Sequence, residues 1–255
     1  MNERIAIVTG ASSGIGREFS KQLGALPGLD AIWLIARRMD RLEAIAKELP
    51  IPAVCIPLDL LDRTSAAVFS ERLAKAAPDV RYFIHAAGFG KFGTYQDLTT
   101  DEIDGMIDLN ARASVHLTYA VLPYMQRGSR VLLLGSASAF QPLPEFNLYA
   151  STKAFVVHFS RALNVELRPR GISVTAVCPG FVRTEFFEVA KRTKNPETCQ
   201  HFSPMYEPAD VVKKAISDSA KGHDLSILGF TTRFRRFMAR VLPAKWVMDT
   251  WMKIK

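Results

Sequence analysis

Short runs of consecutive hydrophobic residues alternate along the chain with segments whose hydrophobic positions recur at helical spacing. Because the runs are nearly continuous rather than alternating, they predict strands covered on both faces. They lie at 4–9, 31–36, 53–58, 82–86, 130–135, 173–178 and 225–229. The segments between them predict helices at 14–26, 40–48, 62–77, 100–127, 148–168 and 208–220. We expect Asp40, Asp62 and Thr100 as N-caps and Pro208 in a first helical turn.

The regular alternation of strand and helix predicts a parallel sheet with right-handed crossovers. The expected fold is therefore α/β, a doubly wound Rossmann-like parallel sheet of about seven strands. We expect residues 1–229 to form a single dinucleotide-binding and catalytic domain, which the length of 255 residues allows. Residues 230–255 are expected to form a helical tail.

The net charge of +8 belongs mainly to that tail. Residues 230–255 hold seven basic side chains and one aspartate, so six of the eight net positive charges lie there. The remaining domain is nearly balanced in charge, which does not favour nucleic-acid binding, and we expect no nucleic-acid partner.

The remaining composition favours a cytoplasmic protein. The first strand begins directly after the N-terminus, leaving no room for a signal peptide, and no apolar stretch reaches the roughly 18–20 residues that span a bilayer. The three cysteines, Cys55, Cys178 and Cys199, are widely spaced and odd in number. This pattern is typical of reduced thiols rather than of a disulfide framework or a metal site, and we expect no metal.

A glycine-rich segment, "TGASSGIG" at 9–16, joins the first strand to the first helix. Gly10, Gly14 and Gly16 let the backbone turn tightly and approach a pyrophosphate, whose charge is favoured at a helix N-terminus. A tight turn without a ligand would need similar residues. The position within a strand–helix–strand series favours a nucleotide site.

The end of the second strand, "IARRMD", predicts the preferred cofactor. In dinucleotide folds an acidic residue here binds the 2′-hydroxyl of the ribose, whereas an arginine suits a 2′-phosphate. The chain has Arg37 and Arg38 and no acid until Asp40. We therefore expect NADP(H) to be preferred over NAD(H), although two arginines also suit an ordinary loop. Asp59, after the third strand, is either an acceptor for the adenine amino group or a helix cap.

In "LYASTKAF" at 148–155, Tyr149 and Lys153 lie one helical turn apart on the same face. The pair is either a solvated helix face or a device that makes a phenol acidic. A lysine cation about 4–5 Å away contributes roughly 4 kcal/mol at an effective dielectric constant of about 20. We expect this interaction to lower the pKa of the tyrosine toward neutrality, where an acid–base catalyst works best.

Two further polar residues complete the predicted site. Ser136 ends the fifth strand, at the edge of the sheet where doubly wound folds bind ligands, and its hydroxyl suits an oxyanion formed from a ketone. Asn110 lies inside a long helical segment, where an asparagine is often a solvated side chain.

Taken together, the motifs resemble the short-chain dehydrogenase/reductase family over about the first 230 residues. The matching features are TGASSGIG, Asp59, "HAAG" at 85–88, Asn110, Ser136, Tyr149, Lys153 and "PGFVRT" at 179–184. The resemblance implies that Tyr149 exchanges a proton with the substrate and that Lys153 lowers its pKa and binds the nicotinamide ribose. It implies that Ser136 orients the carbonyl, with Ser138 as a nearby alternative, and that Asn110 holds a water.

The resemblance also implies the cofactor contacts and a homodimer or homotetramer. Ser12, Ser13 and Arg37 are the expected partners of the 2′-phosphate, and Val182 and Thr184 lie near the carboxamide. The full expected set is Gly10, Ser12, Ser13, Gly14, Ile15, Gly16, Arg37, Arg38, Asp59, Leu60, Ala87, Gly88, Tyr149, Lys153, Pro179, Gly180, Val182 and Thr184.

One position departs from the family pattern. The family usually has asparagine before the Ala-Gly of the fourth-strand turn, where this chain has Ala86. We expect His85 or water to satisfy the backbone groups concerned. His85 is expected to be a hydrogen-bonded core residue and not a catalyst.

Residues 185–207 are expected to form a substrate lid. Its apolar side chains favour a lipophilic or aromatic carbonyl substrate, although they also suit packing against the domain. They are Phe186, Phe187, Val189, Phe202, Met205 and Tyr206, and Phe89 and Phe92 are expected in the same wall.

The tail has an apolar line, Phe230, Phe234, Phe237 and Val241, at helical spacing, and the pattern resumes after Pro243. Arg233, Arg236 and Arg240 lie on another face. Such basic amphipathic helices suit peripheral contact with an anionic membrane, packing on the parent domain, or a subunit contact, and all three uses stay open.

The sequence therefore predicts an NADP(H)-dependent oxidoreductase that moves a hydride between nicotinamide and a ketone or secondary alcohol. The alternative is a non-catalytic dinucleotide-binding sensor or scaffold that holds a membrane or partner through its basic tail. A nucleotide-sugar epimerase fits less well, because such proteins usually append a larger C-terminal substrate domain.

Overall fold

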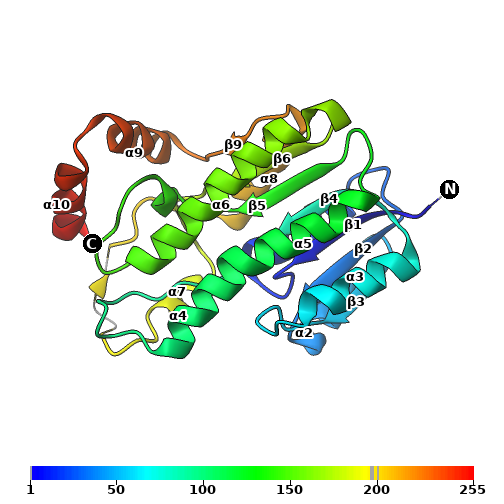
Figure 1. The fold of residues 1–255 in the computed structure, drawn as a ribbon, viewed down its shortest axis with the longest axis horizontal. Helices are drawn as coiled ribbons and strands as arrows, with labels where there is room; N and C mark the ends of the chain where they lie inside the picture. Colours follow the sequence, from blue (N-terminus) through cyan, green and yellow to red (C-terminus); the bar gives the residue numbers. More distant parts are fainter. Residues whose placement is uncertain (1, 196–197, 200) are drawn as a thin grey trace.

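The seven predicted strands form one parallel sheet in the order β3-β2-β1-β4-β5-β6-β9 (Figure 1). We describe a computed structural model, which covers residues 2–195, 198–199 and 201–255. The strands are β1 (Arg4–Thr9), β2 (Ala31–Ala36), β3 (Ala53–Pro57), β4 (Asp79–His85), β5 (Arg130–Leu134), β6 (Ser173–Val177) and β9 (Leu225–Ser226). The order reverses between β1 and β4, the crevice where such folds bind dinucleotides. The predicted doubly wound fold is confirmed.

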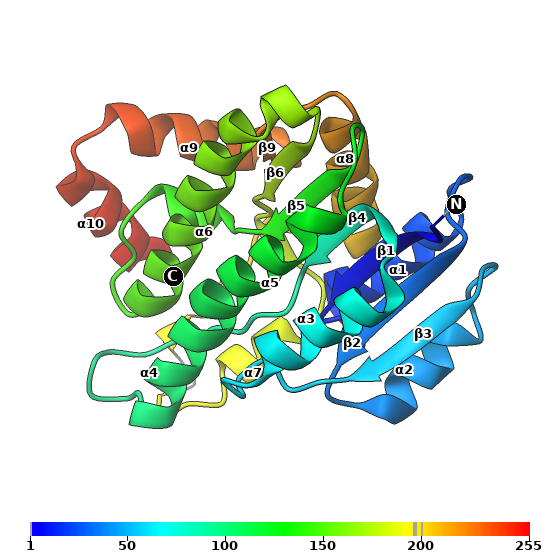
Figure 2. The same ribbon diagram turned by 45° about the vertical axis from the view of Figure 1, so that its right-hand side comes forward.

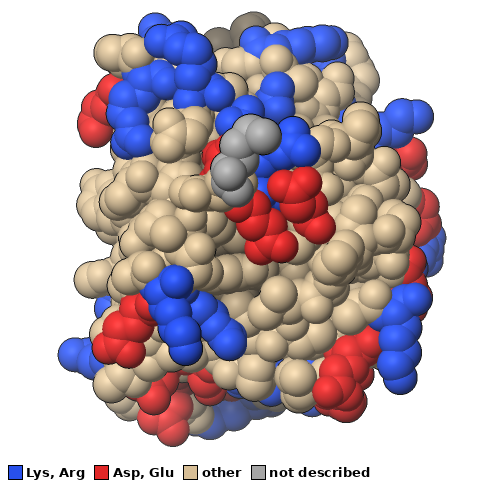
Figure 3. Space-filling model, turned by 90° about the vertical axis from the view of Figure 1, so that its right-hand side faces the viewer, with Lys and Arg blue, Asp and Glu red and all other residues tan. Residues whose placement is uncertain are grey.

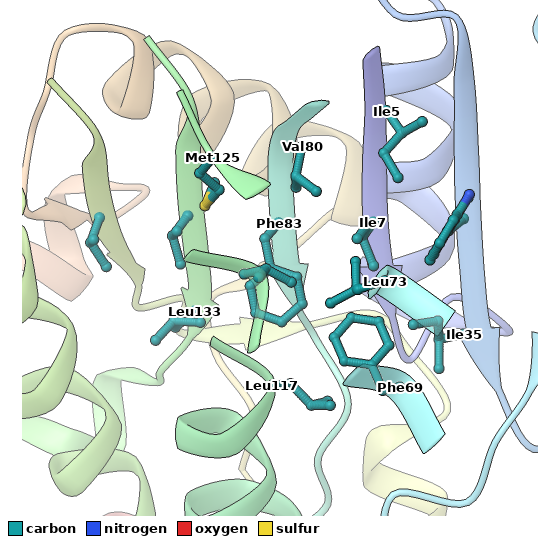
Figure 4. Close-up of a cluster of buried hydrophobic side chains, with 14 of the residues drawn as sticks. Ile5, Ile7, Ile35, Phe69, Leu73, Val80, Phe83, Leu117, Met125 and Leu133 are labelled. Atoms are coloured by element: carbon teal, nitrogen blue, oxygen red, sulfur yellow. The ribbon is translucent and has the colours of Figure 1, made fainter. Parts of the chain in front are cut away.

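Helices cover both faces of the sheet (Figures 1 and 2). One layer contains α1 (Gly14–Gly24), α2 (Met39–Ala46) and α8 (Pro208–Ala220), and the other contains α3 (Ser65–Ala76), α5 (Ala113–Val121) and α6 (Asn147–Glu166). Successive strand residues feed the two cores alternately, with Ile5 and Ile7 in one and Ala6 and Val8 in the other. Figure 4 shows Phe83 of β4 packed with Phe69 and Leu73 of α3. Both sheet faces are therefore dry, as the continuous apolar runs require.

Several helix boundaries differ from the prediction. The N-cap of α3 is Thr64 and not Asp62. The Asp62 carboxylate lies in the turn before the helix, where it accepts hydrogen bonds from the Thr64 backbone and hydroxyl at 2.8 and 2.7 Å. Asp40 lies inside the first turn of α2. The N-cap of α4 (Thr100–Ile107) is Thr99, which forms a capping box with Glu102. Pro208 occupies the first turn of α8, as predicted.

The predicted helix at 100–127 is not continuous. A π-helical turn, Asp108–Arg112, separates α4 from α5, and the helix gives way to a 3₁₀ turn at Leu122–Tyr124. The π-helical turn contains neither proline nor glycine, so the sequence gives no local signal that the α-helix is interrupted here. Asn110 lies in the middle of this turn.

Residues after β6 build a cover over the carboxyl edge of the sheet. The predicted lid contains the short helix α7 (Phe186–Ala190) and the strand β8 (Met205–Tyr206), which pairs with β7 (Phe181–Val182). Lid residues 196–197 and 200 lie outside the described residues. All three cysteines are free thiols.

The tail forms two helices, α9 (Phe230–Val241) and α10 (Ala244–Ile254), at the end of the molecule away from the N-terminus (Figure 1). The indole of Trp251 donates to the carbonyl of Pro144 at 2.9 Å, and the Lys255 ammonium donates to the Glu145 carboxylate. The tail therefore packs on its own domain. Over the described ranges, none of the helices combines the length and apolarity that a bilayer span requires.

Candidate active site

Two glycines of the glycine-rich turn have no room for a side chain. Gly10 has a φ of +66°, and a Cβ there would lie 2.7 Å from the backbone nitrogen of Ala87. A Cβ on Gly16 would lie 2.2 Å from the carbonyl oxygen of Gly10. The loop is thus folded tightly against the β4 turn, and the N-terminus of α1 is open to an anionic group.

The second-strand arginines face the same hollow. The guanidinium of Arg38 donates to the hydroxyl of Ser12 at 3.2 Å. It also lies 3.7 Å from the carboxylate of Glu185, which is held more tightly by Arg41 at 2.7 Å. These arginines keep the pKa of Glu185 below its usual value, chiefly through the hydrogen bond from Arg41.

Arg41 and Glu185 were not predicted as site residues. Arg41 lies three positions after Arg38 on the helical pattern, and that spacing is a signal that sequence reasoning could have used. The pairing with Glu185 joins residues 144 positions apart and depends on the fold. Asp59 accepts a hydrogen bond from the backbone of Leu61 at 3.1 Å, so it stabilises the turn after β3 while also lining the hollow.

Tyr149 is buried beneath an aromatic cover. Its ring stacks on Phe146, with centroids 4.5 Å apart, and contacts Phe186 at 5.3 Å. Desolvation raises the pKa of the phenol above its usual value, and the hydrogen bond with Ser136 opposes that shift only in part. The predicted lowering of this pKa is therefore wrong for the protein without a bound cofactor, because desolvation outweighs the hydrogen bond with Ser136.

Lys153 lies behind Tyr149 and is almost fully buried. Its ammonium is 5.6 Å from the centre of the Tyr149 ring and donates to the carbonyl of Leu134 at 2.7 Å. Burial lowers the pKa of the amine to about 8. The amine thus remains mostly cationic at neutral pH, next to the phenol but held by a strand carbonyl.

Asn110 is held by three hydrogen bonds. Its amide donates to the carbonyl of Phe89 at 2.8 Å and to the hydroxyl of Thr152 at 3.0 Å, and its oxygen accepts from the Phe89 backbone at 3.0 Å. The Thr152 hydroxyl donates in turn to the carbonyl of Tyr149 at 2.8 Å. Asn110 is therefore not a solvated helix side chain. It ties the π turn to the helix that carries Tyr149.

His85 precedes Ala86, the position that departs from the family pattern, and its ring contacts Thr9 on one side and Leu109 on the other. Its Nε2 lies 3.4 Å from the carbonyl of Leu109, and its Nδ1 lies 3.1 Å from the hydroxyl of Thr9. A carbonyl only accepts, so Nε2 carries the proton and Nδ1 accepts from Thr9. Burial lowers the pKa of His85 to about 3, which keeps the ring neutral. His85 is a hydrogen-bonded core residue, as expected, and it fixes the residue before Asn110.

A cavity of about 1420 Å³ runs along the carboxyl edge of the sheet. Every predicted cofactor residue lines it except Lys153, and so does Ser136. Lys153 and Asn110 lie behind Gly88, where an added Cβ would be 3.3 and 2.8 Å from their polar atoms. The hydroxyl of Ser138, the alternative serine, is buried in the cavity wall with no hydrogen-bond partner among the described residues.

The end of the cavity beside Tyr149 is largely aromatic. Phe89, Phe92, Phe186, Phe187 and Val189 line it as predicted. The predicted lid residues Phe202, Met205 and Tyr206 do not line it, and Phe202 packs behind Phe187 with ring centroids 4.5 Å apart. The tail supplies the remaining wall through residues such as Met238 and Trp251.

Comparison with known proteins agrees with this geometry. Residues 4–195 match the short chain dehydrogenase family. The chain belongs to this family. An uncharacterized oxidoreductase of Staphylococcus epidermidis is 30% identical over 190 residues, covering 74% of this chain and 82% of that protein. The chain is thus a short-chain dehydrogenase, an oxidoreductase built on the dinucleotide-binding fold.

Two solved structures resemble this chain over most of its length. One, from Sphingobium yanoikuyae in complex with NADPH, is 28% identical with a TM-score of 0.78, covering 94% of this chain and 96% of that chain. The other is a bulky-bulky ketone specific alcohol dehydrogenase from Comamonas testosteroni, which is 26% identical with a TM-score of 0.74, covering 94% and 93%.

Proposed function

We propose that this short-chain dehydrogenase catalyses NADP(H)-dependent interconversion of lipophilic ketones and secondary alcohols. The observation that carries the proposal is the convergence of Tyr149 and Ser136 on an aromatic cavity, with the Lys153 ammonium buried directly behind the phenol.

The residues of the hollow fit a nicotinamide dinucleotide. Gly10 and Gly16 have no room for a side chain, and the turn and the start of α1 line the cavity, where their backbone N–H groups would bind a pyrophosphate. Arg37, Arg38 and Ser12 would hold a 2′-phosphate, and Lys153 would hold the nicotinamide ribose. Pro179, Gly180, Val182 and Thr184 also line the cavity. When bound, the dinucleotide donates or accepts the hydride.

The proton and the developing charge are handled by this chain's own side chains. In ketone reduction Tyr149 would donate its phenolic proton to the substrate oxygen, and the Ser136 hydroxyl would donate a hydrogen bond to the same oxygen. Burial keeps the phenol protonated, as a proton donor requires. The Lys153 cation would stabilise the phenolate that remains. Asn110 and Thr152 position the helix that carries both residues.

The cavity wall supports a lipophilic substrate. Phe89, Phe92, Phe186 and Phe187 surround the space next to Tyr149, and aromatic walls favour apolar ligands over sugars. The similar alcohol dehydrogenase that is specific for bulky ketones adds to this support.

NADPH consumption with a ketone panel tests the proposal. We expect steady oxidation of NADPH with bulky aromatic, steroid or fatty-acyl ketones, and much slower oxidation with small hydrophilic ketones. Absence of turnover with all of these compounds, in a protein that binds NADPH, would instead favour a dinucleotide sensor or scaffold.

Replacing Arg38 by alanine tests the cofactor preference. We expect kcat/KM for NADPH to fall by about 10–100-fold, because a charge-assisted contact to a 2′-phosphate is lost, while kcat/KM for NADH changes by less than about threefold. Glu185→Gln should have the opposite effect and raise the affinity for NADPH, because the carboxylate beside Arg38 and Arg41 repels a phosphate. Equal losses for both cofactors in the Arg38 variant would contradict the assignment.

Homodimer or homotetramer formation and a cytoplasmic location stay predictions. The support for assembly is an exposed apolar surface on the outer layer, where Tyr119 of α5 and Phe155 and Val165 of α6 are about half exposed. Across the described residues, no group of three or more His, Cys, Asp or Glu side chains is placed to hold a metal ion.

A further inference from the structure

Helix α9 turns its most apolar side outward. Phe230, Phe234, Phe237 and Val241 follow one line along the helix and are 82%, 50%, 59% and 55% exposed. The rings of Phe230 and Phe234 stack with centroids 6.1 Å apart. Surface helices normally bury this side, so the orientation of α9 is the reverse of that expected for a helix that only covers its own domain.

The opposite side of α9 accounts for its attachment to the domain. Thr232 is buried and donates to the hydroxyl of Tyr206 at 3.4 Å. The guanidinium of Arg236 lies over the ring of Phe140, 5.3 Å from its centre. Arg233 and Arg235 donate to the carbonyls of Ile227 and Ser203, at 3.1 Å each. Polar and cationic side chains thus make these contacts with the domain, which leaves Phe230 and Phe237 available for another partner.

Basic side chains border the apolar line along one side. At 100° per residue, Arg233 and Arg240 lie along that border, and both are exposed. Arg235 lies nearer the side that carries Thr232, and its guanidinium donates to the carbonyl of Ser203. Exposed Lys245 and Trp246, the latter 61% exposed, continue this surface into α10. The opposite end of the molecule, in contrast, intersperses acidic with basic groups (Figure 3). We call these residues together the α9 surface: Phe230, Arg233, Phe234, Phe237, Arg240, Val241, Lys245 and Trp246.

We propose that the α9 surface docks on an anionic lipid bilayer, with α9 lying parallel to the membrane plane. Phenylalanines enter the boundary between headgroups and acyl chains, while the arginines along their border extend to the lipid phosphates. Each basic residue close to an anionic leaflet adds to binding. An interfacial tryptophan beside a lysine completes a pattern typical of such helices.

The charges disfavour a second copy of this chain as the occupant. A two-fold contact through α9 would place Arg233 and Arg240 of one copy close to the same residues of the other. Like charges in a desolvated contact oppose association. An anionic surface, by contrast, is complementary to every basic residue of the patch.

The same helix links this surface to the cavity. Phe234 and Met238 line the cavity, whereas Phe230, Phe237, Arg240 and Lys245 do not. Docking would therefore bring one wall of the cavity next to the bilayer. The membrane proposal itself does not depend on the proposed function, and it can be tested with residues outside the cavity.

Sedimentation with lipid vesicles tests the proposal directly. The full chain should sediment with vesicles containing phosphatidylglycerol and not with pure phosphatidylcholine vesicles, and binding should weaken as salt is raised. The F230S/F237S variant should bind at least about tenfold more weakly, because two apolar anchors are lost. Its matched control is Tyr95→Ser, which removes an exposed aromatic ring from a loop outside the tail and should bind like the parent protein.

Charge reversal gives a second, independent test. R240E/K245E should weaken binding to phosphatidylglycerol vesicles by at least about 20-fold, since each basic residue near an anionic leaflet contributes about fivefold. The control K47E/K213E makes the same change of net charge at the C-cap of α2 and on α8. Both positions are exposed and lie outside the α9 surface, so binding should change by no more than about twofold. NADPH binding and thermal unfolding of each variant establish that it is folded.

Two results would overturn the proposal. One is failure of the folded parent protein to bind anionic vesicles, and the other is equal binding by F230S/F237S and Tyr95→Ser. If light scattering shows that F230S/F237S converts an oligomer to a smaller species without changing vesicle binding, the α9 surface is a subunit contact. Blue-shifted fluorescence from Trp246 on vesicle addition, absent in Trp246→Phe, would support docking at the position proposed.

Discussion

Replacing Tyr149 by phenylalanine should lower kcat for ketone reduction by about 10²–10⁴-fold, the usual contribution of a positioned acid–base group. The substitution removes only the hydroxyl. The ring stacks with Phe146 and contacts Phe186, and phenylalanine preserves both contacts, so NADPH binding and thermal stability should change little. Steady-state oxidation of NADPH with the most active ketone of the panel measures the effect.

Tyr82→Phe is the matched control for that experiment. Its hydroxyl accepts a hydrogen bond from Arg130 at 2.9 Å on strands β4 and β5, away from the cavity. Loss of this hydroxyl should affect stability slightly and kcat hardly at all. Turnover by Tyr149→Phe at the parent rate would remove Tyr149 from the chemistry and, with it, the proposed function.

Gly16→Ala should damage both cofactor binding and stability. A Cβ at this position would lie 2.2 Å from the carbonyl oxygen of Gly10 and 2.7 Å from its carbon. Both are backbone atoms, so a side-chain rotation does not relieve the clash and the loop has to move. We expect a loss of about 1–3 kcal/mol in the free energy of unfolding and at least about 100-fold weaker NADPH binding, measured by thermal unfolding and fluorescence titration.

Gly24→Ala, in the same helix, separates this clash from a general effect of adding a methyl group to α1. A Cβ on Gly24 would first meet the end of the Leu49 side chain, at 3.4 Å. That contact is ordinary, and alanine favours helix by up to about 1 kcal/mol over glycine. We expect this variant to bind NADPH like the parent protein. Equal loss of binding in both variants would contradict the role assigned to the tight turn.

The strands and the order of the site motifs could be predicted because each is encoded locally. Strands buried on both faces require continuous apolar runs, and a close approach of backbone to backbone requires glycine. The break in the helix at Asp108–Arg112 could not be predicted, since the segment contains no proline or glycine to mark it. Its effect is large, because it holds Asn110 in a buried network instead of on a solvated face.

The electrostatic state of the site also depended on contacts between distant residues. The spacing of Tyr149 and Lys153 placed them together, but the sequence did not show that Phe146 and Phe186 would cover the phenol or that the ammonium would bond to Leu134. These contacts change the direction of the expected pKa shift of Tyr149. Likewise, the arginines after β2 were identified, whereas Glu185 reaches them only through the folded lid.

The cavity wall formed by the tail has a consequence for how such enzymes diversify. The family match ends at residue 195, and it contains the glycine turn together with Ser136, Tyr149 and Lys153. Met238 and Trp251, which line the cavity, come from a later stretch that the match does not cover. Exchange of this C-terminal stretch between relatives would therefore change the substrate preference, while the residues proposed for hydride and proton transfer stay the same.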